Sequence, residues 1–205
     1  MNFTKQQMSL IIGSILGDGS ITKYKQGERN SQLTIQHSGK QLEYLTWKRQ
    51  LFIDAGFKVS KIYDVSRKYP SYRFNVNLGK EGNLLRHQLY PNGNKTITRH
   101  HLNYLDELGL AIWFMDDGTK QVSWKKDGRC SCRALHISTH NFTYEEQELM
   151  VKYFKVVWNV EVKIYKDRTK FRLNINATNA KTFIDIIKPH IHPSMEYKID
   201  LMYKN

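Results

Sequence analysis

The sequence lacks the features that mark membrane and secreted proteins. No uncharged apolar run approaches the roughly 18 residues that a membrane-spanning helix needs. Met1 leads into the polar segment "NFTKQQ" instead of the basic start and apolar stretch of a signal peptide. No segment has low complexity. The sequence therefore predicts a soluble intracellular protein of the cytoplasm or an organelle matrix, neither secreted nor bound to a membrane.

Cysteine is scarce, because Cys130 and Cys132 are the two cysteines among 205 residues. A disulfide across one intervening residue would be strained. A zinc site would also need His136 and His140, and the spacing of these four residues fits no zinc pattern. We therefore expect reduced thiols on a strand whose alternate residues face opposite ways.

Acidic residues are few relative to basic ones. The chain has 32 Lys and Arg against 19 Asp and Glu, which gives a formal net charge of +13. Both halves are positive, because residues 1–100 carry +10 and residues 101–205 carry +3. This charge favours a polyanionic partner, with nucleic acid as the commonest. A charge that serves solubility alone is the alternative.

The chain repeats itself at an offset of about 100 residues. "YRFNVN" (72–77) matches "FRLNIN" (171–176) at an offset of 99, and Asp18 matches Asp117 at the same offset. "LTIQHS" (33–38) matches "LHISTH" (135–140) at 102, and Lys95 matches Lys198 at 103. Matches in the same order at a nearly constant offset indicate an internal duplication. We expect two units, residues 1–98 and 99–205.

Each unit has the pattern helix, strand, strand, helix, strand, strand, helix. A capping box at Thr4 and apolar residues at helical spacing predict the first helix, which stops at Gly17. Alternating polar and apolar residues predict the strands. The resulting fold class is α+β, with antiparallel sheets that form two curved surfaces. Further helices are expected at 40–57, 81–90, 108–118, 143–158 and 179–188, and strands at 31–38, 71–79, 133–140 and 170–176.

Both units close an apolar helix on an Asp-Gly pair. A single such pair is ordinarily a helix cap and turn. If the units pair about a pseudo-two-fold axis, however, Asp18 and Asp117 arrive at one place, where a divalent cation relieves their repulsion. The small residues Gly13, Ser14 and Gly17 match the larger Ile112, Trp113 and Asp116. Small residues facing large ones would let the two helices approach closely.

These residues resemble a known family. "IIGSILGDG" (11–19) and "LAIWFMDDG" (110–118) are similar to the two copies of the LAGLIDADG motif in monomeric homing endonucleases. The resemblance covers nearly the whole chain. It implies a saddle of two αββαββα units whose strands lie in the DNA major groove. It also implies hydrolysis of both strands of a long asymmetric site, which promotes intron mobility.

The resemblance implies roles for six residues. Asp18 and Asp117 would be the catalytic, metal-binding acids, and Gly17 and Asp116 would offer backbone carbonyls to the metals. Lys95 and Lys198 would be the catalytic basic residues. The implied cofactor is Mg²⁺, with Mn²⁺ as a substitute and Ca²⁺ as an ion that binds without supporting cleavage. Leu16 and Met115 stand where the family name has its first Asp, which is not the catalytic acid.

Polar residues of the strands and their loops are the expected contacts to double-stranded DNA, since Arg, Lys, Gln and Asn read base edges in the major groove. A solvated surface charge is the alternative for any one of them. His37, His100, His101, His190 and His192 are expected to be structural or surface residues. The expected DNA contacts are Lys23, Lys25, Arg29, Gln32, Gln36, Lys61, Arg67, Lys68, Arg73, Asn75, Lys120, Lys125, Arg129, Arg133, Lys163, Lys166, Arg168, Lys170, Arg172 and Asn174.

Two other functions fit the same pattern. An RNA maturase would bind intron RNA with this fold and assist its splicing without cutting DNA. A non-catalytic regulator would bind DNA with the same surface, but it would have no need for two acids at the axis. We therefore favour a metal-dependent, monomeric endonuclease.

Overall fold

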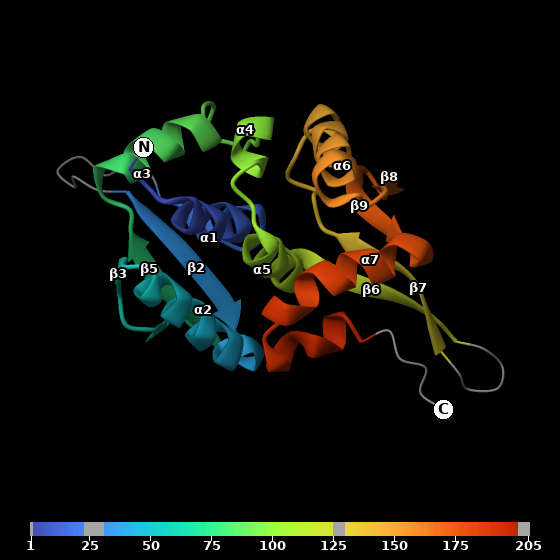
Figure 1. Cartoon of the computed structure of the whole chain (residues 1–205). Helices are drawn as coiled ribbons and strands as arrows, with labels where there is room; N and C mark the ends of the chain where they lie inside the picture. The colour runs from blue at the N-terminus through green and yellow to red at the C-terminus, as the bar shows by residue number, and fades with distance from the viewer. Residues whose placement is uncertain (1, 23–30, 125–129, 201–205) are drawn as a thin grey trace.

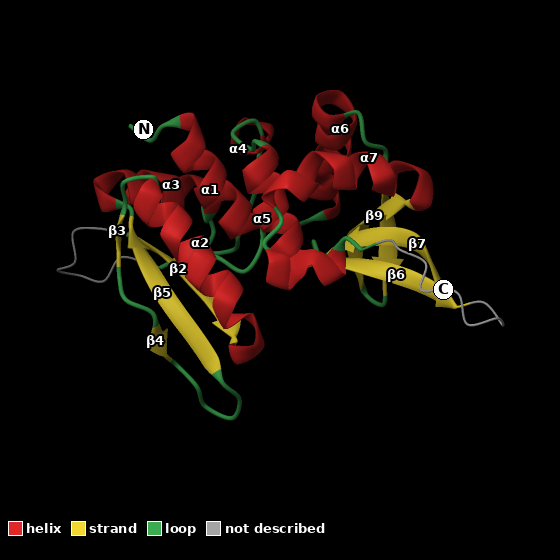
Figure 2. Cartoon of the chain, turned by 60° about the horizontal axis from the view of Figure 1, so that its bottom comes forward, coloured by secondary structure: helices red, strands yellow, loops and turns green. Residues whose placement is uncertain are grey.

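The computed structural model describes residues 2–22, 31–124 and 130–200. Two helices, α1 (Lys5–Leu16) and α5 (Glu107–Asp117), lie side by side at the centre, and one antiparallel sheet lies to each side of them (Figure 1). Figure 2 shows the same two sheets at opposite ends of the molecule. This arrangement confirms the predicted α+β class.

The first half continues from α1 through a sheet and two more helices. Its strands are β1 (Ser20–Ile21), β2 (Gln32–Ser38), β3 (Lys58–Val59), β4 (Tyr63–Asp64) and β5 (Ser71–Asn77). The sheet order is β1-β2-β5-β3, and β4 also pairs with β5. The other helices are the 3-10 turn η1 (Gly39–Gln41), α2 (Leu42–Asp54) and α3 (Gly79–Leu89).

The second half has the same order of sheet positions. Its strands β6 (Gly118–Trp124), β7 (Cys130–Ile137), β8 (Val162–Asp167) and β9 (Lys170–Asn176) form a sheet in the order β6-β7-β9-β8. Its other helices are α6 (Tyr144–Trp158) and α7 (Ala177–Ile187), followed by the 3-10 turns η2 (Lys188–His190) and η3 (Pro193–Lys198). The short helix α4 (Arg99–Leu102), which was not predicted, joins the two halves. No helix among the described residues is long and apolar enough to cross a bilayer.

Local sequence signals explain where the helices begin. Thr4 accepts a hydrogen bond from the Gln7 backbone, and the Gln7 side chain accepts one from the Thr4 backbone, which completes the predicted capping box of α1. Thr143 and Glu146 form the same motif at α6. The β2 strand alternates exposed and buried residues, as its sequence predicts.

The packing of α1 against α5 differs in part from the prediction. Gly17 faces Asp116 as expected, because a Cβ at Gly17 would overlap the Asp116 side chain. Gly13, however, faces the backbone of Gly109 and not a large side chain. The reason is that the crossing helices bring Gly13 to Gly109 and not to Ile112, its match in the repeat. Trp113, the match of Ser14, packs in the core with its ring centroid 5.8 Å from that of Phe154. The close approach of the two helices therefore depends on glycine against glycine.

Candidate active site

The carboxyl ends of α1 and α5 meet at the centre of the molecule. Gly17 has no side chain, so the Asp116 carboxylate occupies the space beside the end of α1. The backbone N–H of Asp18 donates a hydrogen bond to Asp116 Oδ2 at 3.2 Å. The end of α1 is thus in direct contact with the Asp116 side chain at the end of α5.

The two predicted lysines reach the ends of these helices, one at each helix. Lys95 Nζ donates to the carbonyl oxygens of Ile15 at 2.5 Å and Gly17 at 3.2 Å. Lys198 Nζ donates to those of Met115 at 2.5 Å and Asp116 at 3.1 Å. Lysine ammonium groups are favourable at helix C-termini, because the carbonyl groups there carry partial negative charge. Each lysine ammonium group therefore bonds one of the two carbonyl groups predicted to bind metal, that of Gly17 or that of Asp116.

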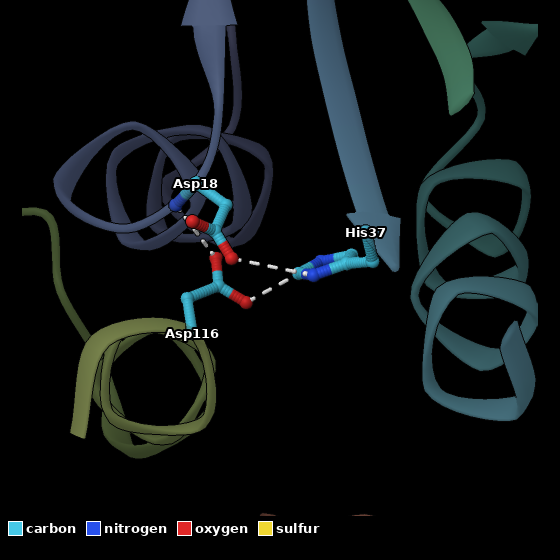
Figure 3. A group of neighbouring side chains, drawn as sticks. All are labelled: Asp18, His37 and Asp116. Atoms are coloured by element: carbon cyan, nitrogen blue, oxygen red, sulfur yellow. Dashed lines mark hydrogen bonds and ion pairs between the residues drawn. The ribbon is translucent and has the colours of Figure 1, made fainter. Parts of the chain in front are cut away.

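A buried polar cluster surrounds the Asp116 side chain. Lys48 Nζ lies 2.6 Å from Asp116 Oδ2, and both side chains are fully buried. The Tyr44 hydroxyl donates to Asp116 Oδ1 at 2.8 Å. The His37 ring faces both acids, with Nδ1 3.3 Å from Asp18 Oδ2 and Nε2 3.6 Å from Asp116 Oδ1 (Figure 3). Neither histidine contact has hydrogen-bond geometry.

The electrostatic environment of the two motif aspartates differs. Burial raises the pKa of Asp117, the charges of Asp18 and Asp116 raise it further, and the value reaches about 7. Burial also raises the pKa of Asp18, but the nearby His37 and the charge of Lys48 outweigh that effect and hold the pKa below its usual range. Asp117 is therefore the acid that gains most from an added cation.

Burial also shifts the pKa values of the two lysines and of Tyr44. It lowers the pKa values of Lys95 and Lys198, and the nearby acids oppose this shift. Burial, followed by the charge of Asp116, raises the pKa of Tyr44 well above its usual value. Tyr44 therefore keeps its proton and remains a hydrogen-bond donor to Asp116.

Sequence reasoning missed three members of this cluster, namely His37, Lys48 and Tyr44. His37 was expected to be a structural or surface residue. Two signals were present, however. His37 is on the same row of β2 as the buried Leu33 and Ile35, and Lys48 is on the buried face of α2. A basic residue on an apolar face indicates a buried acidic partner.

The first sheet carries most of its predicted DNA contacts on one open face. Arg73 on β5 donates to Gln36 Oε1 on β2 through Nε at 3.1 Å and Nη2 at 2.6 Å. Asn75 is half-buried on the same face, and Gln32 is exposed. Lys61, Arg67 and Lys68 are exposed in the loops on either side of β4.

The second sheet differs more from the prediction. Lys163 and Lys170 are exposed on the face of the sheet that carries Arg172. Arg172 Nη1 lies 3.3 Å from Asp167 Oδ2. Arg133 is exposed where the β6–β7 register shifts, and Arg168 follows β8 with a φ of 58°.

Three predicted DNA contacts are not exposed on the open face of the second sheet. Lys120 pairs in register with Leu135 and Lys166 with Phe171, so both side chains leave the sheet on its helix-covered face. Lys120 Nζ instead donates to the Asp200 carbonyl at 2.5 Å. Asn174 lies on the open face but is 4% exposed, because its amide bonds the His136 ring. Lys23, Lys25, Arg29, Lys125 and Arg129 lie outside the described residues.

The cysteine segment forms β7, as predicted, and Cys132 carries a free thiol. His136 bonds Gln121 and Asn174, while His140 lies 3.2 Å from Asp167 Oδ2. Within the described ranges, one group of three potential metal-binding side chains was found, and it consists of Asp18, His37 and Asp116. Their ligand atoms lie within 4.8 Å of one another.

The fold and the paired acids define the class of this protein. A model of the LAGLIDADG DNA endonuclease family matches residues 8–183, and the chain belongs to this family. The match confirms the resemblance carried by the two motifs.

Individual relatives are similar along nearly the whole chain. A probable intron-encoded endonuclease of Wickerhamomyces canadensis is 28% identical over 96% of this chain and 84% of its own length. The cytochrome b mRNA maturase bI2 of Debaryomyces hansenii is 26% identical over 95% of this chain and 74% of its own. The solved structure of the homing endonuclease I-WcaI bound to its DNA recognition sequence has a TM-score of 0.81 at 26% identity. That match covers 98% of this chain and 89% of the other.

Proposed function

We propose that this protein is a monomeric, site-specific DNA endonuclease that hydrolyses both strands of its target with Mg²⁺ and thereby promotes intron mobility. The observation that carries the proposal is the meeting of acids at the ends of α1 and α5. Burial raises the pKa of Asp117, and the nearby charges of Asp18 and Asp116 raise it further, to about 7. A regulator that merely binds DNA has no use for this repulsion.

The acids present fit a divalent cation. Asp18 and Asp117 carry oxygen ligands of the kind that Mg²⁺ prefers, and the carbonyls of Gly17 and Asp116 are the proposed further ligands. The Asp116 side chain is already engaged by Lys48 and Tyr44, which leaves Asp18 and Asp117 as the carboxylates for the ion. Bound Mg²⁺ would supply charge neutralisation at the phosphate and a more acidic water molecule.

The remaining residues position DNA and stabilise charge. Lys95 and Lys198 hold their ammonium groups at the two helix ends, where each can stabilise negative charge that develops on the phosphate. The open faces of the two sheets supply Arg73, Gln36 and Lys163 for contacts with base edges and phosphates. The proposed units, residues 1–98 and 99–205, would each contribute one sheet.

Cleavage by aspartate variants tests this function. The probe is a duplex recovered from a randomised library by its binding to the protein in Ca²⁺. D18N and D117N are each expected to retain binding and to lose cleavage in Mg²⁺ by roughly a thousandfold, because each removes a carboxylate that the proposed ion needs. Gel analysis of a plasmid that carries this duplex measures the loss.

The matched control is D54N, which removes an exposed acid at the end of α2 and should cut at the wild-type rate. Linearisation of the plasmid by D18N or D117N at that rate would contradict the proposal. So would a wild-type protein that binds the selected duplex tightly and never cuts it.

A second candidate function is that of an RNA maturase, which the similarity to the bI2 maturase favours. Such a protein would bind intron RNA and assist splicing. An RNA-binding and splicing assay with D18N separates the two functions, because splicing assistance should survive the loss of the carboxylate.

A further inference from the structure

The two helix ends differ in one side chain, and that difference lies beside the candidate active site. At an offset of 99, Gly17 of the first motif matches Asp116 of the second. A Cβ at Gly17 would overlap Cβ and Oδ2 of Asp116, so the glycine leaves the space that Asp116 fills. The Asp116 side chain therefore reaches across the helix pair into the first half of the molecule.

The first half holds this carboxylate with side chains from two elements. Lys48 and Tyr44 of α2 contact its two oxygens at 2.6 and 2.8 Å. The His37 ring of β2 packs edge-on against Tyr44, with ring centroids 5.1 Å apart. We name Asp116, Lys48, Tyr44 and His37 the Asp116 cluster.

The Asp116 cluster touches Asp18 at two points. The Asp18 backbone N–H donates to Asp116 Oδ2, and the Asp18 carboxylate lies 3.3 Å from the His37 ring (Figure 3). The Asp18 side chain is 42% exposed, whereas those of Asp116, Lys48 and His37 are fully buried. The exposed Asp18 thus contacts a buried frame through its backbone N–H and its carboxylate.

The second half has different residues at the matching positions. At an offset of 102, His37 matches Thr139, Lys48 matches Met150 and Tyr44 matches Glu146. Thr139 donates to Gln147 at 2.9 Å, and Glu146 accepts a hydrogen bond from the Ile97 backbone at 2.8 Å. Thr139 therefore bonds within the second half, whereas Glu146 bonds the backbone of Ile97 in the first half. Neither residue reproduces the contacts of the Asp116 cluster, which is one-sided.

Stability alone is a weak reason for such a pair. Removing two charges from water costs several kcal/mol per ion, and apolar residues of similar volume are often at least as stable as a buried ion pair. The Lys48–Asp116 pair is fully buried and lies beside an acid of the candidate active site. A role in that site accounts for its location.

We propose that the Asp116 cluster positions Asp18 but not Asp117, so that the two active centres differ and the two DNA strands are cut at different rates. Asp116 and Lys48 are then positioning residues, since they act through Asp18 and their side chains are fully buried. The inference rests on the proposed function, because it assigns unequal roles within the same site.

The test compares two double variants on a selected duplex with a different fluorescent label on each strand. K48M/D116N removes both charges of the pair and so leaves no unpaired charge behind. T139V/Q147L removes the buried polar pair at the matching place in the second half. Single-turnover rates are measured for each strand in Mg²⁺, together with duplex affinity in Ca²⁺.

K48M/D116N is expected to slow one strand about 10–100-fold, the usual range for residues that hold a metal ligand, while the other strand slows less than about threefold. T139V/Q147L should leave the ratio of the two rates at its wild-type value. Equal slowing of both strands by K48M/D116N, or no slowing, overturns the inference. If K48M/D116N does not fold, Y44F replaces it, and a wild-type ratio for Y44F overturns the inference in the same way.

Calorimetric titration of Ca²⁺ into the D117N–DNA complex measures ion binding at Asp18 and does not depend on cleavage. Adding K48M/D116N to this background should weaken Ca²⁺ binding about 10–100-fold, and unchanged binding would overturn the inference. A wild-type protein that fails to cut contradicts the proposed function, and this titration then still decides the role of the cluster.

Discussion

In the first half of the molecule Gly17 and Asp18 follow the last residue of α1, whereas in the second half Asp116 and Asp117 are the last two residues of α5. Backbone relations at the two ends are alike, since one lysine bonds the carbonyl of Gly17 and the other that of Asp116. The side chains differ, because Gly17 supplies space and Asp116 fills it. The two helix ends thus share a lysine–carbonyl contact, while their side chains are complementary.

The consequence is a different environment for each catalytic candidate. Asp18 lies beside His37 and Lys48, which favour its charged form. Asp117 is dominated by burial and by two acids, which disfavour its charged form. An equivalent position in the repeat therefore does not imply an equivalent ionisation, and the predictions below test this contrast.

The largest expected effect is a change in stability of opposite sign for the two acids. In metal-free buffer the folded protein holds the Asp117 proton up to about pH 7, whereas the unfolded chain releases it near its ordinary pKa of 3.8. The folded state binds more protons in this window, so its stability falls as the pH rises through it. D117N removes this penalty and should raise the free energy of unfolding at pH 8 by up to about 4 kcal/mol.

Asp18 gives the opposite sign, because its lowered pKa stabilises the folded state above the pKa of the unfolded chain. D18N should therefore lower the free energy of unfolding at pH 8. Urea denaturation in EDTA at pH 5 and pH 8 measures both variants, with D54N as the exposed control. Equal changes in the free energy of unfolding for D18N and D117N would contradict the proposed difference between the two acids.

The second prediction concerns the surface that the halves share. G13A places a methyl group against the carbonyl oxygen of Gly109, a backbone atom that cannot turn aside. Alanine at an ordinary helix position is about 1 kcal/mol more favourable than glycine. The overlap should reverse that sign and cost about 2–3 kcal/mol of unfolding free energy, measured with urea.

T46A on the exposed surface of α2 serves as the control for helix propensity and should change stability by less than about 0.5 kcal/mol. An increase in stability for G13A would mean that the helices are farther apart than the structure has them.

The sequence predicted local features well because their causes are local. Capping at Thr4 and Thr143 and the alternation in β2 each depend on residues near one another in the chain. The helix interface could not be predicted in the same way. The repeat pairs Gly13 with Ile112, whereas crossing helices bring Gly13 to Gly109, a contact between non-equivalent positions.

The Asp116 cluster was missed for a related reason. Lys48 and Asp116 are 68 residues apart, and no periodic pattern relates β2, α2 and α5. The strand alternation placed Asn75 and Asn174 on the same kind of face, but only the fold reveals which of the two is covered. In both cases the environment of the residue depends on contacts with residues far away in the sequence.

The smallest expected effect separates Asn75 from Asn174, which occupy matching positions in the two sheets. Asn75 is half-buried, with Nδ2 3.0 Å from the Tyr63 hydroxyl. Asn174 is 4% exposed, and its amide donates to His136, whose pKa is lowered by burial and whose ring is therefore neutral. N75A should weaken duplex affinity by about 1–2 kcal/mol, within the usual cost of a lost base contact.

N174A should instead lower the free energy of unfolding by about 1–3 kcal/mol, because it leaves a buried ring nitrogen of His136 without a partner. Its duplex affinity should stay within about threefold of the wild-type value. Fluorescence anisotropy at one fixed salt concentration measures affinity, since phosphate contacts make binding depend on salt. If N174A weakened duplex binding more than N75A did, Asn174 would contact DNA despite its burial against His136, and the contrast between the two sheets would be wrong.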